Sequence, residues 1–175
     1  NANILGLIPK YKSFLERSAV VVTENPKSQI SEAFRSIRAN LEFIDNSKGP
    51  KIVATTSTVP GEGKTFIGIN LAAIFSLLDK KVIILDFDLR KPRIAKIFNA
   101  DGKKGLSSIL IGRSSLDECI LKTGIDNLDF IPSGPVPPNP SELINKEETR
   151  ELLETLKETY DYIFIDTPPV GLVTD

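Results

Sequence analysis

The stretch that decides the fold runs from Ile52 to Leu78 and reads IVATTSTVPGEGKTFIGINLAAIFSLL. Its first five residues, 52–56, form a short apolar run typical of a buried strand. A glycine-rich turn follows at 60–63, and the remaining residues form a helical apolar run that ends near Leu78. The stretch therefore predicts a strand, a loop and a helix in immediate succession.

Three further apolar runs predict strands at 82–85, 128–131 and 162–165, with helical stretches around 105–121 and 141–159. Unbroken runs of Val, Ile and Leu are typical of strands that are buried on both faces of a sheet. Their alternation with helices favours an α/β fold: a doubly wound, mainly parallel sheet flanked by helices.

The composition excludes several kinds of chemistry. The chain has 22 Lys and Arg against 23 Asp and Glu, a formal net charge of −1, and no histidine. Without histidine there is no Ser-His-Asp catalysis, His-ligated zinc or imidazole pH switch. The near-neutral charge argues against nucleic acid as a partner. The single cysteine, Cys119, favours a reducing compartment and is interpreted as a buried structural thiol.

The glycine-rich turn is the strongest indication of a binding site. It belongs to the run TVPGEGKT at 58–65, in which Gly61 and Gly63 let backbone N–H groups approach a phosphate. Lys64 is placed to reach the β- and γ-phosphates, and the Thr65 hydroxyl to ligate Mg²⁺. The strict pattern has glycine at its first position, where this chain has Thr58. The run therefore predicts a nucleotide phosphate loop.

Carboxylates follow two of the predicted strands. Asp86 and Asp88 come directly after the strand at 82–85, and Asp166 follows the strand at 162–165. Open α/β sheets bind ligands at the carboxyl ends of their strands. An acidic residue after four apolar ones is the Walker B arrangement, in which the carboxylate holds Mg²⁺ directly or through water.

These motifs together resemble those of the bacterial tyrosine kinases, the cytoplasmic kinase domains of capsular and exopolysaccharide co-polymerases. The resemblance rests on PGEGKT at 60–65, LDFDLRKP at 85–92 and FIDTPP at 164–169, which match the Walker A, A′ and B motifs. GPVPPNPSEL at 134–143 and GLS at 105–107 also match. The resemblance implies a MinD/ParA-like P-loop NTPase fold and an ATP- and Mg²⁺-dependent protein-tyrosine kinase that autophosphorylates in trans.

The resemblance also assigns roles to residues. The implied nucleotide contacts are Pro60, Gly61, Glu62, Gly63, Lys64, Thr65 and Phe66. The implied catalytic residues are Lys64, Asp86, Asp88 and Asp166. The implied Mg²⁺ ligands are Thr65, Asp86, Asp88 and Asp166. Which of Asp86 and Asp88 is the general base stays open.

A helix is predicted from Ser28 to about Asn46, because its apolar residues recur at spacings of four and three: Ile30, Phe34, Ile37, Leu41 and Ile44. Three charged residues, Glu32, Arg35 and Arg38, lie clear of that stripe. By themselves they are interpreted as a solvated face with one ion pair. They also match the Glu-x-x-Arg-x-x-Arg signature of the family, which implies an oligomer interface.

The resemblance implies partners and a location. The first partner is the chain itself, in a homo-oligomeric ring that an octamer would satisfy, with the C-terminal tyrosine cluster of a neighbouring subunit. The others are a cognate tyrosine phosphatase and the polysaccharide export and polymerisation machinery. The location is the cytoplasmic face of the bacterial inner membrane, with this stretch itself soluble. Residues 1–27 are expected to be an extended juxtamembrane-like lead-in, and 28–175 the kinase domain.

The ends of the sequence suggest a longer protein. The chain starts without methionine and stops directly after a predicted core strand. We expect the C-terminal strands, the adenine contacts and the acceptor tyrosines to lie beyond Asp175.

Tyr160 and Tyr162 start a predicted core strand and are interpreted as packing residues. Six basic residues after the second strand form either a solvated face or a docking surface for an acidic, tyrosine-bearing segment: Arg90, Lys91, Arg93, Lys96, Lys103 and Lys104.

Two other functions fit the phosphate loop. One is a MinD/ParA-type ATPase, although that group carries a signature lysine where this chain has Val59. The other is a scaffold whose nucleotide occupancy controls the assembly of an export complex, with little phosphotransfer.

Overall fold

A computed structural model describes residues 4–10, 19–144 and 147–172. Its centre is a five-stranded sheet in the order β1-β5-β2-β4-β3. Four strands run parallel: β1 (Lys51–Thr55), β5 (Tyr162–Asp166), β2 (Val82–Asp86) and β4 (Leu128–Ile131). The short β3 (Leu121–Lys122) pairs antiparallel with β4. The predicted α/β class and mainly parallel sheet are confirmed.

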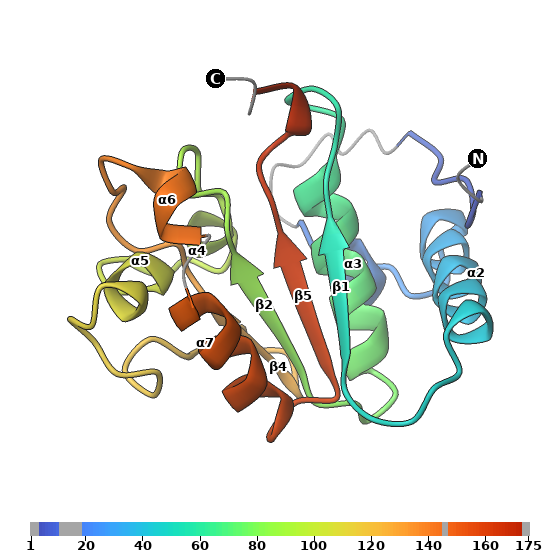
Figure 1. Ribbon diagram of the computed structural model, residues 1–175. Helices are drawn as coiled ribbons and strands as arrows, with labels where there is room; N and C mark the ends of the chain where they lie inside the picture. Colours follow the sequence, from blue (N-terminus) through green and yellow to red (C-terminus); the bar gives the residue numbers. More distant parts are fainter. Residues whose placement is uncertain (1–3, 11–18, 145–146, 173–175) are drawn as a thin grey trace.

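Helices cover both faces of the sheet, as Figure 1 shows with α3 and α2 on one side and α7 on the other. Alternate residues of β2 enter the two cores: Val82 and Ile84 pack with α3 (Lys64–Ser76), whereas Ile83 and Leu85 pack on the opposite face. All five residues of β2 are buried, as its unbroken apolar run indicates.

The first core is extended outward by α2 (Gln29–Ile44), which buries Ile30, Phe34 and Ile37. Ser28 caps this helix, because its side chain accepts a hydrogen bond from the Ser31 backbone N–H. The predicted helix is confirmed, with its end at Ile44.

The second core is covered by α7 (Glu147–Lys157), which buries Leu152 and Leu156, and by α5 (Leu106–Leu110). The helical stretch predicted around 105–121 is wrong over most of its length, because only α5 is helical there and the chain then turns into β3. The stretch predicted at 141–159 consists of α6 (Pro140–Ile144) and α7, and residues 145–146 between them lie outside the described residues.

The prediction of a wholly extended lead-in is also wrong. Val21–Glu24 form the one-turn helix α1, and Val20, Val21 and Val22 are buried in the first core. The fully buried Asn70 of α3 secures this segment: its amide donates to the Ala19 carbonyl and its carbonyl accepts from the Val22 N–H. The division of the chain at residue 27 stays a prediction, although the residues before it contribute to the core.

Two short helices complete the fold. The sequence did not indicate α4 (Ile94–Ile97), which follows β2, and a 3₁₀ turn at Val170–Leu172 follows β5. Among the residues described, no helix is long and apolar enough to span a bilayer.

Candidate active site

The carboxyl ends of three neighbouring strands bring the predicted site residues together. Asp166, the last residue of β5, is in register with Thr55 of β1 on one side and with Asp86 of β2 on the other. The glycine-rich loop leaves β1 at this edge and leads into α3. Residues more than 100 positions apart in the sequence therefore face one another because β5 is inserted between β1 and β2.

The loop has the conformation that its glycines allow. Gly61 and Gly63 have φ angles of +89° and +92°, in the left-handed region that L-residues rarely adopt. Gly63 is the N-cap residue of the 13-residue helix α3, so the positive end of the helix dipole faces the loop. This arrangement is the kind of backbone cradle that binds phosphate groups.

The start of the loop is tied to the segment that follows β5. The Val170 N–H donates to the Ser57 carbonyl at 2.9 Å, and the Gly171 N–H to the Thr58 carbonyl at 3.1 Å. A β-carbon on Gly171 would lie 2.5 Å from the Thr58 oxygen. Only glycine at 171 allows the two segments to approach this closely.

Lys64 is held by two of the carboxylates. Its Nζ lies 3.1 Å from both oxygens of Asp166 and 3.3 Å from Oδ2 of Asp88. The Thr65 hydroxyl donates to Asp166 Oδ2 at 2.7 Å. All four side chains lie at the same edge of the sheet, where the lysine and the threonine hydroxyl are paired with carboxylates.

Asp86 is fully buried and only partly satisfied. Its Oδ2 accepts from the backbone N–H groups of Arg93 and Ile94, at 3.2 and 3.1 Å, whereas Oδ1 has no hydrogen-bond partner among the described residues. Burial is the main cause that raises the pKa of Asp86 to about 7. The neighbouring carboxylates of Asp166 and Asp88 also raise this pKa, whereas the hydrogen bonds from the Ile94 and Arg93 N–H groups lower it. Burial likewise raises the pKa of Asp166, against the opposing influence of Thr65 and Lys64.

A cavity of about 440 Å³ opens beside these residues. Of the predicted nucleotide contacts, all but Glu62 line it: Pro60, Gly61, Gly63, Lys64, Thr65 and Phe66. Asp88 lines it too, and three cations of the basic cluster form part of its wall: Arg90, Lys91 and Arg93. The cavity is therefore lined mainly by groups that suit an anionic ligand with an apolar portion.

Four residues of this wall are not among the predicted site residues: Ala19, Ile97, Pro168 and Pro169, of which the two prolines belong to the motif FIDTPP. Ala19 comes from the segment before α2 and Ile97 from α4. No local pattern marks either residue, because both reach the cavity only through tertiary packing.

The structure keeps the other predicted residues apart from the cavity. Glu32, Arg35 and Arg38 lie on α2, where Glu32 pairs with Arg35 and Arg38 pairs with Glu42 at 3.0 Å. Lys103 pairs with Asp101 and Lys104 with Glu118, so the basic cluster is divided between the cavity wall and a separate surface.

The interpretations of the described tyrosines and of the cysteine agree with their surroundings. Tyr160 is buried, and its hydroxyl donates to Asp129 Oδ2 at 2.8 Å. Tyr162 packs on Phe75 with ring centroids 4.1 Å apart. Cys119 is buried, and burial raises the pKa of its thiol.

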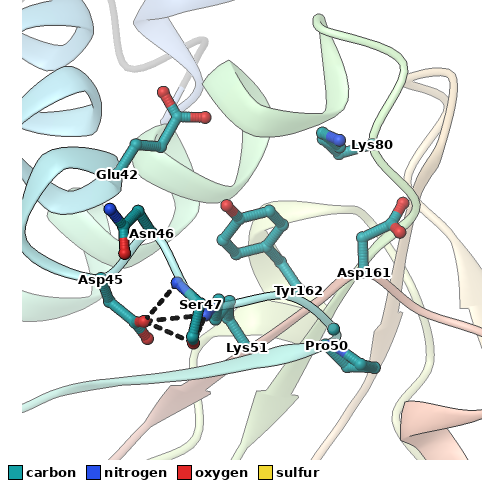
Figure 2. A pocket seen from close by; sticks show the side chains of 10 residues that line it. Glu42, Asp45, Asn46, Ser47, Pro50, Lys51, Lys80, Asp161 and Tyr162 are labelled. Carbon is teal, nitrogen blue, oxygen red and sulfur yellow. Dashed lines mark hydrogen bonds and ion pairs between the residues drawn. The ribbon is translucent and has the colours of Figure 1, made fainter.

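A second cavity, of about 350 Å³, lies at the opposite edge of the sheet, where β1 and β5 begin. Figure 2 shows the Tyr162 ring in it, with the ion pair between Lys51 and Asp45 on one side and Lys80 and Asp161 on the other. It contains none of the predicted site residues. The candidate active site is therefore the cavity at the carboxyl edge.

Comparison with known proteins identifies the family. Residues 50–175 match the family model described as AAA domain. The chain is 40% identical to "Tyrosine-protein kinase YwqD" of Bacillus subtilis over 163 residues, which cover 93% of this chain and 68% of that protein. The kinase domain of Escherichia coli tyrosine kinase ETK superposes with a TM-score of 0.90 at 32% identity, covering 98% of this chain and 70% of that one.

A more distant neighbour bears on the ATPase alternative. The septum site-determining protein MinD from Pyrococcus horikoshii, complexed with Mg-ADP, superposes with a TM-score of 0.59 at 27% identity, covering 69% of this chain and 49% of that one. The P-loop fold is thus shared, but the likeness to the kinases is closer in sequence, in structure and in coverage. This chain belongs to the bacterial tyrosine-protein kinases, a family of nucleotide-binding P-loop proteins.

Proposed function

We propose that this chain binds Mg-ATP at the carboxyl edge of the sheet and transfers the γ-phosphoryl group to a protein tyrosine. The observation that carries the proposal is the convergence of Lys64, Asp88 and Asp166 at a glycine-rich loop, with the buried Asp86 beside them. Phosphoryl transfer needs little covalent chemistry from the protein. It needs an acceptor oxygen held in line and the neutralisation of developing charge.

The residues fit a nucleotide and a magnesium ion. The loop backbone and the α3 N-terminus suit phosphate oxygens, and Lys64 would bind a phosphate in place of its carboxylate partners. Bound Mg²⁺ supplies charge neutralisation, and Thr65, Asp86, Asp88 and Asp166 are the residues proposed to hold it. Among the described residues there is no ready-made group of three or more acidic, Cys or His ligands. Mg²⁺ usually keeps several waters and takes one or two carboxylates together with substrate phosphates, so the proposal does not require all three carboxylates to contact the ion directly.

Asp86 and Asp88 are both candidates for the base that accepts the tyrosine proton. Burial raises the pKa of Asp86 to about 7 in the absence of a metal ion, and bound Mg²⁺ would lower it, so that the ionised carboxylate is present to accept a proton. Asp88 lines the cavity, so it is more accessible to an incoming hydroxyl. The roles of base and Mg²⁺ ligand can be exchanged between the two without altering the proposed reaction.

The acceptor is proposed to be a C-terminal tyrosine cluster of a neighbouring subunit, in a homo-oligomeric ring built through Glu32, Arg35 and Arg38 of α2. Arginine suits this role because its planar group pairs with carboxylates through two hydrogen bonds. The setting proposed for the ring is the cytoplasmic face of the inner membrane, where the ring regulates capsular or exopolysaccharide synthesis and export. A tyrosine phosphatase is proposed to reverse the tyrosine phosphorylation.

The full-length protein tests the proposed reaction. It is incubated with γ-labelled ATP and Mg²⁺ beside Lys64→Ala and beside Lys48→Ala, which removes an exposed lysine. We expect label on tyrosine in the wild type and in Lys48→Ala, and none in Lys64→Ala. Phosphate released to water without labelled protein would favour the ATPase, and nucleotide binding with neither result would favour the scaffold.

The interface is tested separately by size measurement of the double variant Arg35→Ala with Arg38→Ala. We expect a smaller assembly, less trans-phosphorylation and unchanged ADP affinity per monomer, because α2 does not line the nucleotide cavity. An unchanged assembly size would contradict the interface.

A further inference from the structure

Glu62 is the one predicted nucleotide contact that does not line the cavity, and its side chain instead binds the backbone of its own loop. Its carboxylate Oε2 accepts hydrogen bonds from the backbone N–H groups of Thr58, at 2.8 Å, and Val59, at 3.1 Å. The residue does not line the nucleotide cavity. The loop is thereby closed on itself from its fifth position to its first two.

These two bonds complete the fastening of the loop's start. The Thr58 carbonyl already accepts from the Gly171 N–H at 3.1 Å. Because the Thr58 N–H donates to Glu62, both the N–H and the carbonyl of Thr58 are hydrogen-bonded. Thr58 is not among the described non-glycine residues with positive φ, so a β-carbon is tolerated where the strict motif has glycine.

A fastened loop matters for phosphate binding. The N–H groups of a flexible glycine-rich loop lose conformational freedom when they converge on a phosphate, and that loss weakens binding. A loop held in one conformation beforehand avoids most of it. The N–H groups of Thr58 and Val59 are also kept from competing for the ligand.

We propose that Glu62 is a positioning residue, whose carboxylate holds the first half of the phosphate loop in the conformation that binds nucleotide. The inference rests on the proposed nucleotide binding and adds a residue to it. It gives Glu62 a role through the loop backbone instead of the direct contact that the resemblance implied.

The charge of the Glu62 carboxylate would have the opposite effect on nucleotide binding. A carboxylate near a triphosphate repels it, and removal of the charge would then tighten binding. Two substitutions separate these effects. Glu62→Gln removes the charge but keeps an oxygen that accepts from both N–H groups, whereas Glu62→Ala removes both. Glu158→Ala is the control, because it removes one exposed carboxylate beyond α7, at the other edge of the sheet.

The first measurement is the dissociation constant of Mg-ADP for the full-length protein and the three variants, by titration calorimetry. We expect Glu62→Ala to weaken binding about tenfold, as the loss of one to two net hydrogen bonds would. Glu62→Gln is expected to stay within about threefold of the wild type, and Glu158→Ala to match it. Wild-type affinity in Glu62→Ala, or tighter binding in both Glu62 variants, would overturn the inference.

The second measurement is hydrogen–deuterium exchange of the peptide that contains Thr58 and Val59, without nucleotide. Exchange is expected to be slow in the wild type and in Glu62→Gln and faster in Glu62→Ala, with equal melting temperatures showing that the fold is intact. Equal exchange in all three proteins would overturn the inference about Glu62. The proposed function would still stand if the wild type binds ADP. A wild type that binds no nucleotide would overturn both.

Discussion

Replacement of Asp86 by asparagine is expected to stabilise the nucleotide-free protein at and above neutral pH, although it removes a proposed catalytic group. The Asp86 side chain is fully buried, and its Oδ1 has no partner among the described residues. Asparagine resembles the protonated acid in size and in lacking charge, and its carbonyl oxygen still accepts from the Arg93 and Ile94 N–H groups.

The magnitude follows from the displaced pKa. Burial moves the pKa of Asp86 from 3.8 to about 7. Between these values the folded state binds more protons than the unfolded state, so the free energy of unfolding falls as pH rises from about 4 to about 7. At about 1.4 kcal/mol per pKa unit, ionised Asp86 destabilises the fold by at most roughly 4 kcal/mol above pH 7. For a domain of this size that corresponds to a melting temperature lower by on the order of 10 °C.

The assay is thermal unfolding of wild type and Asp86→Asn, without nucleotide and with a chelator, across pH 4 to 8. We expect the two melting temperatures to lie close together at the acidic end and to separate as the pH rises, with the variant higher. Asp117→Asn, which neutralises an exposed aspartate, serves as the control. A difference between wild type and Asp86→Asn that stays constant over this range would refute the reasoning.

Two further substitutions test single contacts. Gly171→Ala would place a β-carbon 2.5 Å from the Thr58 oxygen, so we expect the phosphate loop to shift and Mg-ADP to bind about tenfold more weakly in calorimetry; wild-type affinity would show that the loop start does not matter. Tyr160→Phe removes the hydrogen bond to Asp129, and we expect it to lower the free energy of unfolding in urea by about 1 kcal/mol. A loss of several kcal/mol would point to repacking around the ring instead.

Local patterns were sufficient for much of the fold and the site. The four parallel strands lie within one residue of the predicted runs, because each is continuous in sequence and apolar. The phosphate loop was predictable because glycine, lysine and threonine stand at fixed spacings within eight residues. The convergence of Asp86, Asp88 and Asp166 was predictable because the carboxyl ends of parallel strands meet at one edge.

The errors fall where local preference and packing disagree. Val20–Val22 are separated from the nearest predicted element by Pro26 and contain no helical repeat, yet they are buried, and Asn70 binds the Ala19 carbonyl and the Val22 N–H of this segment. The stretch after α5 has apolar residues at helical spacing, but β4 offers a free edge with which β3 pairs. Neither outcome has a signal within the segment itself.

The amino-acid sequence by itself determined the class of fold, the strand–loop–helix that is proposed to bind phosphate and the residue types at the candidate site, because each depends on neighbours within a few positions. Tertiary structure alone decided that β5 lies between β1 and β2, and hence that Lys64 pairs with Asp166 across 102 positions. It also decided that Asp86 is buried deeply enough to shift its pKa and that Glu62 turns back on its own loop. These properties depend on distance and solvent exclusion, which arise only when segments remote in sequence pack together.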